Sequence, residues 1–217
     1  MWTYHGIDVH WLGHDTFVLQ GSKTVIIDPF KANGAYRADI LLISHEHFDH
    51  FSEDDIRRFS GPSTVIVAPK QCEELLKQFR NETKIVEPGQ GVEIAGVKVE
   101  PVPAYNLNKF REPGKVFHPK EDKKVGYVVT LDGVRFYHAG DSDATPEMKS
   151  LNVDVALLPV SGTYVMTAEE AAEAAKAMRA KVFVPMHFGK IVGTKSDAEK
   201  FKSLLGPGAD VQILEPE

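Results

Sequence analysis

Cysteine is almost absent from this chain, and its scarcity removes several kinds of site. Cys72 is the single cysteine among 217 residues. One cysteine cannot build a disulfide framework, and no Cys-x-x-Cys pair is present to hold a zinc knuckle. Cys72 lies in the helical run 70–76, where a buried, unreactive thiol is the ordinary interpretation. We therefore expect function to reside in other side chains.

Long apolar runs are also missing. No run approaches the roughly 18 residues that a membrane-spanning helix needs. Residues 1–5 lack the basic and apolar regions of a signal peptide. We therefore expect a cytoplasmic protein with no membrane span.

An excess of positive charge is missing as well. The formal net charge is -6, whereas a general nucleic-acid binder needs a basic surface that displaces counterions, so we expect no nucleic-acid partner. The exception is the polar, irregular segment 103–124, which is longer than the usual connection and is therefore a candidate functional loop. Its basic residues would suit a small anionic substrate, although a solvated basic loop is the alternative. They are Lys109, Arg111, Lys115, Lys120, Lys123 and Lys124.

No linker, repeat or Gly-x-Ser-x-Gly nucleophile elbow interrupts the chain. A composition of 42% hydrophobic and 26% charged residues suits one globular domain over residues 1–217. Apolar runs and turn residues predict a β-rich α/β (α+β) chain. The expected strands cover 7–12, 16–19, 24–27, 39–44, 63–68, 84–86, 92–94, 97–102, 125–131, 134–137, 153–158, 181–185 and 211–214. The expected helices cover 53–59, 69–79 and 167–178, and a capping box at 196–199 opens one more.

Histidine, in contrast, is concentrated directly after the buried strand 39–44. Ser-His-Glu-His-Phe-Asp-His follows at 44–50. Adjacent histidines repel when protonated and carboxylates resist burial without a partner, so a divalent cation stabilises such a cluster. A solvated polar loop is the alternative. His45 and His47 point to one side of an extended chain, whereas Asp49 and His50 follow a bend. Four ligands crowd a single tetrahedral ion, which favours two ions about 3.5–4 Å apart.

Two later strand ends offer the ligands that complete such a centre. Gly140-Asp141 follows the strand 134–137, and glycine there permits a close approach of the chain. His187 follows the strand 181–185.

These elements together resemble the metallo-β-lactamase superfamily. The His-x-His-x-Asp-His element is matched by His45, His47, Asp49 and His50, the Gly-Asp element by Gly140-Asp141, and the late histidine by His187. Asp28-Pro29 resembles the opening aspartate of that superfamily. The Trp-Leu-Gly-His run at 11–14 resembles the branch that holds ascorbate-phosphate lactonases and N-acyl-phosphatidylethanolamine phospholipases.

The resemblance implies a four-layer αβ/βα sandwich with the site at one edge. It implies that Asp141 bridges the two ions, and that His187 shares an ion with Asp49 and His50. It also raises a difficulty, because the histidine expected on the first ion between the two motifs is missing near residues 101–106. His118, swinging in from the long loop, is one replacement, and Asn106 is a weaker oxygen donor.

Two further residues have open roles. His14 either lies beside the site or is a plain turn histidine, since it follows a strand and a glycine. Asp28 is expected to accept a hydrogen bond from a ligand histidine and to orient it, although a simple strand-ending Asp-Pro is the alternative.

The expected function is a metal-dependent hydrolase. Divalent metal lowers the pKa of bound water from about 15.7 toward 7, and the resulting hydroxide attacks a small anionic ester, lactone or phosphodiester. Asp49 is the expected catalytic residue, as ligand and proton acceptor. Zinc is the expected metal, with manganese or iron as alternatives. A non-catalytic metal-binding or regulatory protein and a di-iron oxidoreductase on the same fold are the competing functions.

Overall fold

Consecutive apolar residues build strands that are buried on both faces. In β4 (Thr24–Ile27), Val25 and Ile27 pack into the larger of two hydrophobic cores, whereas Ile26 packs into the smaller one. Successive strand residues point to opposite faces of a sheet, so such a strand needs apolar cover on both sides. This pattern places β4 in an inner layer of the molecule.

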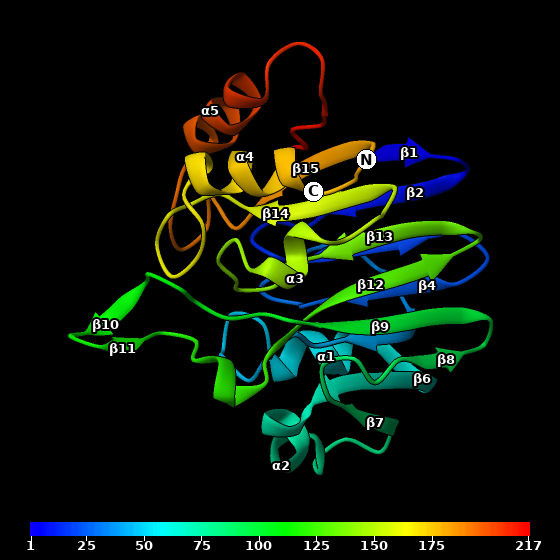
Figure 1. Ribbon diagram of the computed structural model, residues 1–217. Helices are drawn as coiled ribbons and strands as arrows, with labels where there is room; N and C mark the ends of the chain where they lie inside the picture. Colours follow the sequence, from blue (N-terminus) through cyan, green and yellow to red (C-terminus); the bar gives the residue numbers. More distant parts are fainter.

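The computed structural model describes residues 1–217 and contains two seven-stranded sheets stacked face to face (Figure 1). The first sheet has the order β1-β2-β3-β4-β5-β6-β7. Its other strands are β1 (Trp2–Tyr4), β2 (Ile7–Trp11), β3 (Phe17–Gln20), β5 (Ala38–Leu42), β6 (Ser60–Pro69) and β7 (Glu82–Val86). The second sheet has the order β16-β15-β14-β13-β12-β9-β8. Its strands are β8 (Val92–Ile94), β9 (Val97–Pro103), β12 (Val125–Leu131), β13 (Val134–His138), β14 (Val155–Pro159), β15 (Val182–Met186) and β16 (Asp210–Val211).

Helices cover the outer faces of both sheets (Figure 1). The first sheet carries α1 (Glu53–Phe59) and α2 (Glu73–Leu76), and the second carries α3 (Pro146–Lys149), α4 (Ala168–Ala177) and α5 (Lys195–Leu205). The larger core lies between the sheets and beneath α4 and α5, and the smaller core lies between the first sheet and its helices. This arrangement confirms the predicted αβ/βα sandwich. None of the helices is both long and apolar enough to cross a bilayer.

Several element boundaries differ from the sequence-based prediction. The helix expected at 69–79 is a 3-10 turn at Lys70–Cys72 followed by α2. Its start lies after Pro69 because parallel pairing with β7 extends β6 through that residue, and its end lies at Leu76. The last helix, α5, begins at Lys195 after the capping residue Thr194, whose capping box uses Asp197, so the predicted box at 196–199 starts two residues late. The strand expected at 211–214 is the short β16, and β1 was not predicted. The segment 103–124 contains a hairpin, β10 (Phe110–Glu112) with β11 (Lys115–Val116), that projects from the body (Figure 1).

The strand directions bring the candidate ligands to one edge. β5 runs parallel to β4 and β6, and β13 runs parallel to β14 and β15. The histidine-rich turn follows the carboxyl end of β5, Asp141 follows β13, and His187 follows β15. Loops at the carboxyl ends of parallel strands are the usual place for ligands in α/β proteins.

Gly126 in β12 is expected to be irreplaceable for reasons of packing. A Cβ there would lie 2.5 Å from the His138 carbonyl oxygen and 2.6 Å from that of Ala139. We expect Gly126→Ala to lower the free energy of unfolding by about 1–3 kcal/mol, because backbone beside the site must move. Urea unfolding of the metal-free protein measures this loss. Gly208→Ala is the control, since its Cβ would meet nothing within 4 Å, and equal losses in both variants would contradict the packing argument.

Candidate metal centre

Three histidines from distant segments form one donor set, the first pocket. The Nε2 atom of His45 lies 3.0 Å from Nδ1 of His47, and Nε2 of His118 lies 3.3 Å from the same Nδ1 atom. One ring nitrogen from each of the three lies within 4.8 Å of the others. His45 and His118 are buried, whereas His47 is exposed at the mouth of the site. Three convergent imidazoles are a set that a divalent transition metal binds well.

His118 reaches the first pocket because its loop is fastened by Asn106. The His118 amide donates to Asn106 Oδ1 at 2.9 Å, and the Asn106 amide donates to the His118 carbonyl at 2.8 Å. The Asn106 side-chain amide also donates to the carbonyl of Tyr164 at 2.8 Å. Asn106 therefore holds the loop, and the imidazole of His118 lies beside those of His45 and His47.

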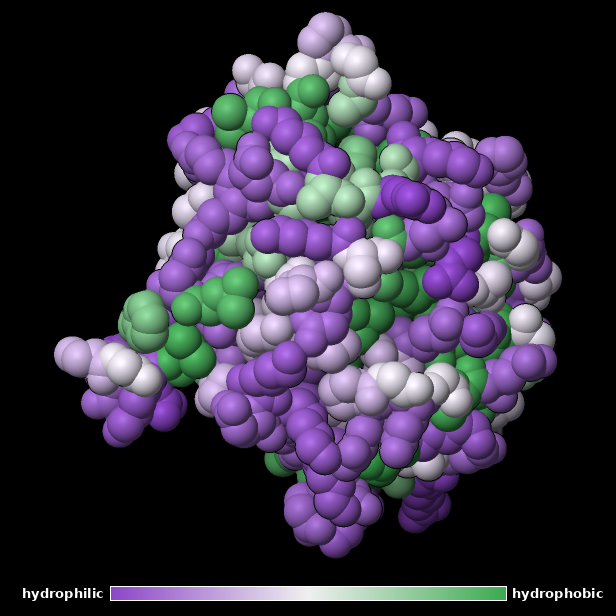
Figure 2. Space-filling view, in the orientation of Figure 1, coloured by the Kyte–Doolittle hydropathy of each residue, from purple (hydrophilic) through white to green (hydrophobic).

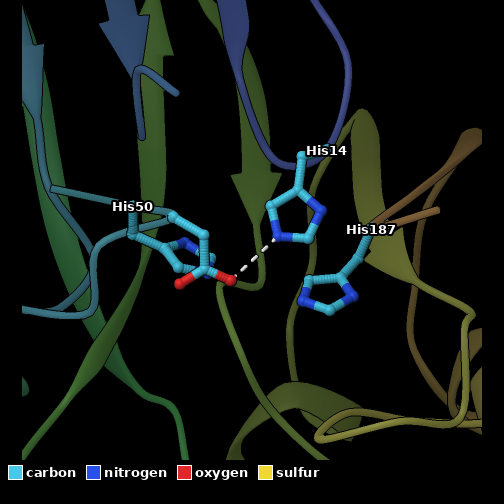
Figure 3. A group of neighbouring side chains, drawn as sticks. His14, His50 and His187 are labelled. Carbon is cyan, nitrogen blue, oxygen red and sulfur yellow. Dashed lines mark hydrogen bonds and ion pairs between the residues drawn. The ribbon is translucent and has the colours of Figure 1, made fainter. Parts of the chain in front are cut away.

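A second donor set, the second pocket, gathers Asp49, His50, His187 and His14. One ligand atom from each lies within 4.8 Å of the others. Figure 3 shows His14, His50 and His187 arriving from three different loops, with a dashed contact from His14. That contact joins His14 Nε2 to Asp49 Oδ2 at 3.2 Å, and the His14 ring centroid lies 4.2 Å from that of His187. His14 thus lies inside the site and is no isolated turn histidine.

Asp141 lies between the two pockets. Its Oδ2 atom is 3.7 Å from Nε2 of His118 and 4.0 Å from Nε2 of His45. Its Oδ1 atom is 3.2 Å from Nε2 of His50 and 3.2 Å from Nε2 of His187. The two oxygens of one buried carboxylate therefore face different donor sets.

The buried polar atoms at the centre lack ordinary partners. Nε2 of His50, Nε2 of His187 and Oδ1 of Asp141 are buried and make no well-aligned hydrogen bond, although both ring nitrogens crowd that one oxygen at 3.2 Å. Buried polar groups in folded proteins are nearly always paired, so such a group of orphaned atoms needs an explanation. Imidazole nitrogens and carboxylate oxygens are the donors that zinc, manganese and iron take in proteins. The residues present therefore fit a divalent cation.

The outer nitrogens of three histidines are held by hydrogen bonds. Nδ1 of His50 lies 2.9 Å from Asp28 Oδ2, Nδ1 of His45 lies 2.9 Å from the Ser44 hydroxyl, and Nδ1 of His187 lies 2.9 Å from the Ser161 hydroxyl. The backbone N–H and the hydroxyl of Ser44 also donate to Asp28, at 2.7 and 2.6 Å. Such outer contacts fix the ring orientation of metal-binding histidines.

The two pockets differ in protonation. Burial lowers the pKa of His45 well below its ordinary value and that of His118 to about 4, so both imidazoles are neutral at neutral pH. Burial alone would also lower the pKa of His187, but attraction to Asp141 and Asp15 outweighs it and raises the pKa to about 9. The pKa of His50 is likewise raised, by Asp141 and Asp28 against burial. In the metal-free protein the second pocket thus holds protons that a cation would release.

Asp15 is a site residue that sequence reasoning missed. It is fully buried, neither of its oxygens has a hydrogen-bond partner, and Oδ2 lies 3.8 Å from Nδ1 of His50. It forms a further donor group with His50, Asp141 and His187. Burial raises the pKa of Asp15 to about 7. The available signal was its position directly after His14 in a turn between two strands.

The basic residues of segment 103–124 are mostly neutralised. Lys109 pairs with Glu170, Lys115 with Glu112, Lys120 with Glu147, Lys123 with Glu87 and Lys124 with Glu46. Arg111 is the one of the six without an ion pair, and it lines a separate hollow on the hairpin side. The loop therefore gives little support to recognition of an anionic substrate.

The two pockets open into one cavity of about 270 Å³. Its lining residues are His47, Phe48, Asp49, Phe117, His118, Asp141, Tyr164 and Ile191. A larger hollow of about 390 Å³ lies at the amino ends of β14 and β15, but no cluster of metal donors lines it. Chemistry therefore belongs at the smaller cavity.

Comparison with known proteins shows which family and fold this chain is similar to. Residues 8–187 match the sequence model of the β-lactamase superfamily domain. A UPF0173 metal-dependent hydrolase from Thermococcus kodakarensis is 34% identical over 97% of each chain. A crystal structure of a protein from Parabacteroides distasonis has a TM-score of 0.84 at 32% identity, covering 97% of this chain and 94% of that one. A diiron β-hydroxylase from Streptomyces venezuelae has a TM-score of 0.76 at 15% identity, covering 99% of this chain and 54% of that one, and shares the fold alone.

His187 is expected to give the metal-free protein a pH-dependent stability. Its pKa rises from 6.5 to about 9 on folding, so its stabilising contribution is complete below about pH 6.5 and is lost as the pH rises through 9. We expect the free energy of unfolding in chelator to fall across this window, and His187→Gln to flatten the fall. Urea unfolding at a series of pH values measures both slopes. The exposed His5 supplies the control, because His5→Asn should keep the wild-type slope, and an unflattened slope in His187→Gln would refute the assignment.

Proposed function

This chain belongs to the β-lactamase superfamily, with the UPF0173 metal-dependent hydrolases among its relatives, and we propose that it hydrolyses a small ester, lactone or phosphodiester at a centre for two divalent cations. The observation that carries the proposal is Asp141. Its two oxygens face separate donor sets, as a carboxylate shared by two cations would. The finer branch, with the ascorbate-phosphate lactonases and N-acyl-phosphatidylethanolamine phospholipases, stays a prediction.

We assign three residues to each cation in addition to the shared Asp141. His45, His47 and His118 of the first pocket would hold one cation, and Asp49, His50 and His187 of the second pocket the other. His14, the fourth member of the second pocket, and the neighbouring Asp15 are further donors there. Zinc suits the imidazole-rich first pocket, whereas the carboxylates of the second pocket also suit manganese or iron.

Asp49 is the residue we assign to proton transfer. When bound, divalent cations act as Lewis acids and lower the pKa of water toward 7. Burial would raise the pKa of Asp49, but its contact with His14 and its attraction to His50 together outweigh burial and hold that pKa below the ordinary value. The Asp49 carboxylate is therefore ionised at neutral pH and lines the cavity, where it can accept a proton from water. His14, through Nε2, keeps Asp49 Oδ2 in place.

The charge of the proposed metal centre favours a substrate whose reacting group is anionic or gains negative charge during the reaction. Two divalent cations would carry four positive charges, and the carboxylates that line the cavity, Asp49 and Asp141, carry two negative ones; the buried Asp15 and Asp28 do not line the cavity. The floor of the cavity would then be electropositive, which favours a phosphodiester oxygen or the oxygen that gains charge during ester hydrolysis.

The competing functions are separable by measurement. Similarity to the diiron β-hydroxylase rests on fold, whereas the more closely related proteins are named hydrolases. Iron content with substrate-dependent oxygen uptake would indicate an oxidoreductase. Tight metal binding with no turnover of esters, lactones or phosphodiesters would indicate a non-catalytic protein.

Removing the Asp49 carboxylate is expected to abolish most hydrolysis. We expect Asp49→Ala to lower the rate about 10²–10⁴-fold, since it removes a proton acceptor as well as a metal donor. The measurement is initial rates of the zinc-loaded protein on 4-nitrophenyl acetate, bis(4-nitrophenyl) phosphate and a γ-lactone. Asp54→Ala, in the exposed first turn of α1, is the matched control and should keep the wild-type rate. Wild-type rates in Asp49→Ala would contradict the assignment.

Removing the His118 imidazole is expected to empty the first pocket only. We expect His118→Ala to retain about one zinc per chain where the wild type retains about two, because two histidines then remain beside Asp141. Elemental analysis after zinc loading and desalting gives the count. His5→Asn should keep two. An unchanged zinc count in His118→Ala would show that the loop histidine holds no metal.

A further inference from the structure

The cavity has a polar floor and an apolar wall. His47, Asp49, His118 and Asp141 form the floor, where the two pockets open. The other lining residues, on the wall, are Phe48, Phe117, Tyr164 and Ile191. A mainly apolar lining with a few convergent polar groups is typical of sites for small molecules that carry an apolar part.

Two residues of the wall are exposed although they are apolar. Phe48 is 68% exposed and Ile191 is 41% exposed, and they come from different loops beside the second pocket. The Phe48 ring lies edge-on to that of Phe30 with centroids 5.7 Å apart, and this aromatic contact stabilises the position of Phe48. Exposed apolar side chains grouped around a cavity gain stability when a ligand covers them.

The opposite side of the wall is also preformed. The rings of Phe117 and Tyr164 meet edge to face with centroids 4.8 Å apart. The amide of Phe117 donates to the carbonyl of Lys109, which joins the wall to the base of the β10–β11 hairpin. Leu107 and Phe110 there are 51% and 54% exposed, and Figure 2 shows apolar residues gathered beside this projecting hairpin. The hairpin and its base therefore carry further exposed apolar side chains outside the cavity lining.

No protein cation faces this wall. Neither a lysine nor an arginine lines the cavity, and five of the six basic residues of the 103–124 segment are bound in ion pairs. The unpaired Arg111 lines a different hollow. A second anionic group on a substrate, away from the reacting bond, would therefore lose water without gaining a partner.

We propose that this site takes esters whose acyl part is an apolar chain or ring, packed between Phe48, Ile191 and the Phe117–Tyr164 pair. This rests on the proposed hydrolytic function and names its substrate class. In the reaction the acyl C–O bond breaks, the water oxygen bonds to the acyl carbon, and a proton passes to the leaving alkoxide. At about 270 Å³ the cavity lies near the lower end of small-molecule pockets, so it suits a short acyl chain or a single ring.

The first test is a series of ethyl esters followed by pH-stat titration of the zinc-loaded protein. We expect kcat/KM to rise roughly fourfold per added methylene from acetate through butyrate toward hexanoate, because each methylene leaves water for the wall. Monoethyl succinate, which places a second carboxylate in the cavity, should be at least about tenfold poorer than ethyl butyrate. A flat series, or a preference for the succinate ester, would overturn the apolar subsite.

Two wall variants test the location of that subsite. Phe48→Ala and Ile191→Ala should each lower the hexanoate-to-acetate ratio of kcat/KM severalfold, and both side chains are exposed enough for folding to survive. Leu204→Ala is the matched control, an apolar residue of α5 that is 39% exposed and outside the cavity lining, and its ratio should match the wild type. An unchanged ratio in the Phe48→Ala, Ile191→Ala double variant would overturn the proposal.

A binding measurement separates this inference from the proposed hydrolysis. Calorimetry on the zinc-loaded protein compares n-hexylphosphonate with methylphosphonate, which share the charged end and differ in the apolar chain. At least tenfold tighter binding of the hexyl compound, with this difference lost in Phe48→Ala, would support the subsite. If that result came with no turnover of any ester, the proposed hydrolysis alone would be refuted. Equal affinities together with turnover of every ester refute the subsite alone.

Discussion

The placement of one carboxylate, that of Asp141, governs the rest of the site. Its two oxygens face the two different pockets, and four buried histidines, His45, His50, His118 and His187, lie around it. Glycine at 140 makes the approach feasible, since a Cβ there would lie 3.0 Å from the Val125 carbonyl and 3.1 Å from Cβ of Ser44, on a backbone with φ of +59°. The two sheets therefore meet at Asp141 with little room for another arrangement.

Rigidity around the centre is achieved with strained backbone that the surroundings hold in place. His14, Asp28 and His187 have φ values of +54°, +45° and +60°, a region that costs residues other than glycine about 1–3 kcal/mol. The His14 carbonyl accepts hydrogen bonds from the His187 amide and the Trp11 indole, which joins the two loops. The ammonium of Lys190 donates to three backbone carbonyls in neighbouring loops. These contacts keep the donors converged before any cation binds.

The sequence was informative where ligands are contiguous or lie at strand ends. The His45–His50 turn follows a strand that its apolar run marks plainly, and the resemblance carried by this turn, Gly140-Asp141 and His187 predicted the layered fold. The sequence alone could not decide whether His118 reaches the site, because its position depends on long-range hydrogen bonds that Asn106 makes to the loop and to Tyr164. Asp15 was missed, since only the folded chain brings it against His50. The partners that neutralise Lys109 and Lys120 lie far along the chain, so the charge of the basic loop was overestimated from sequence.

Anomalous diffraction at the zinc edge from a crystal of the zinc-loaded protein tests the central claim most directly. The account predicts two peaks roughly 3.5–4 Å apart, one beside His45, His47 and His118 and the other beside Asp49, His50 and His187, with one Asp141 oxygen toward each. A single peak bound by both oxygens of Asp141, or no peak with the carboxylate still paired to His50 and His187, would contradict it.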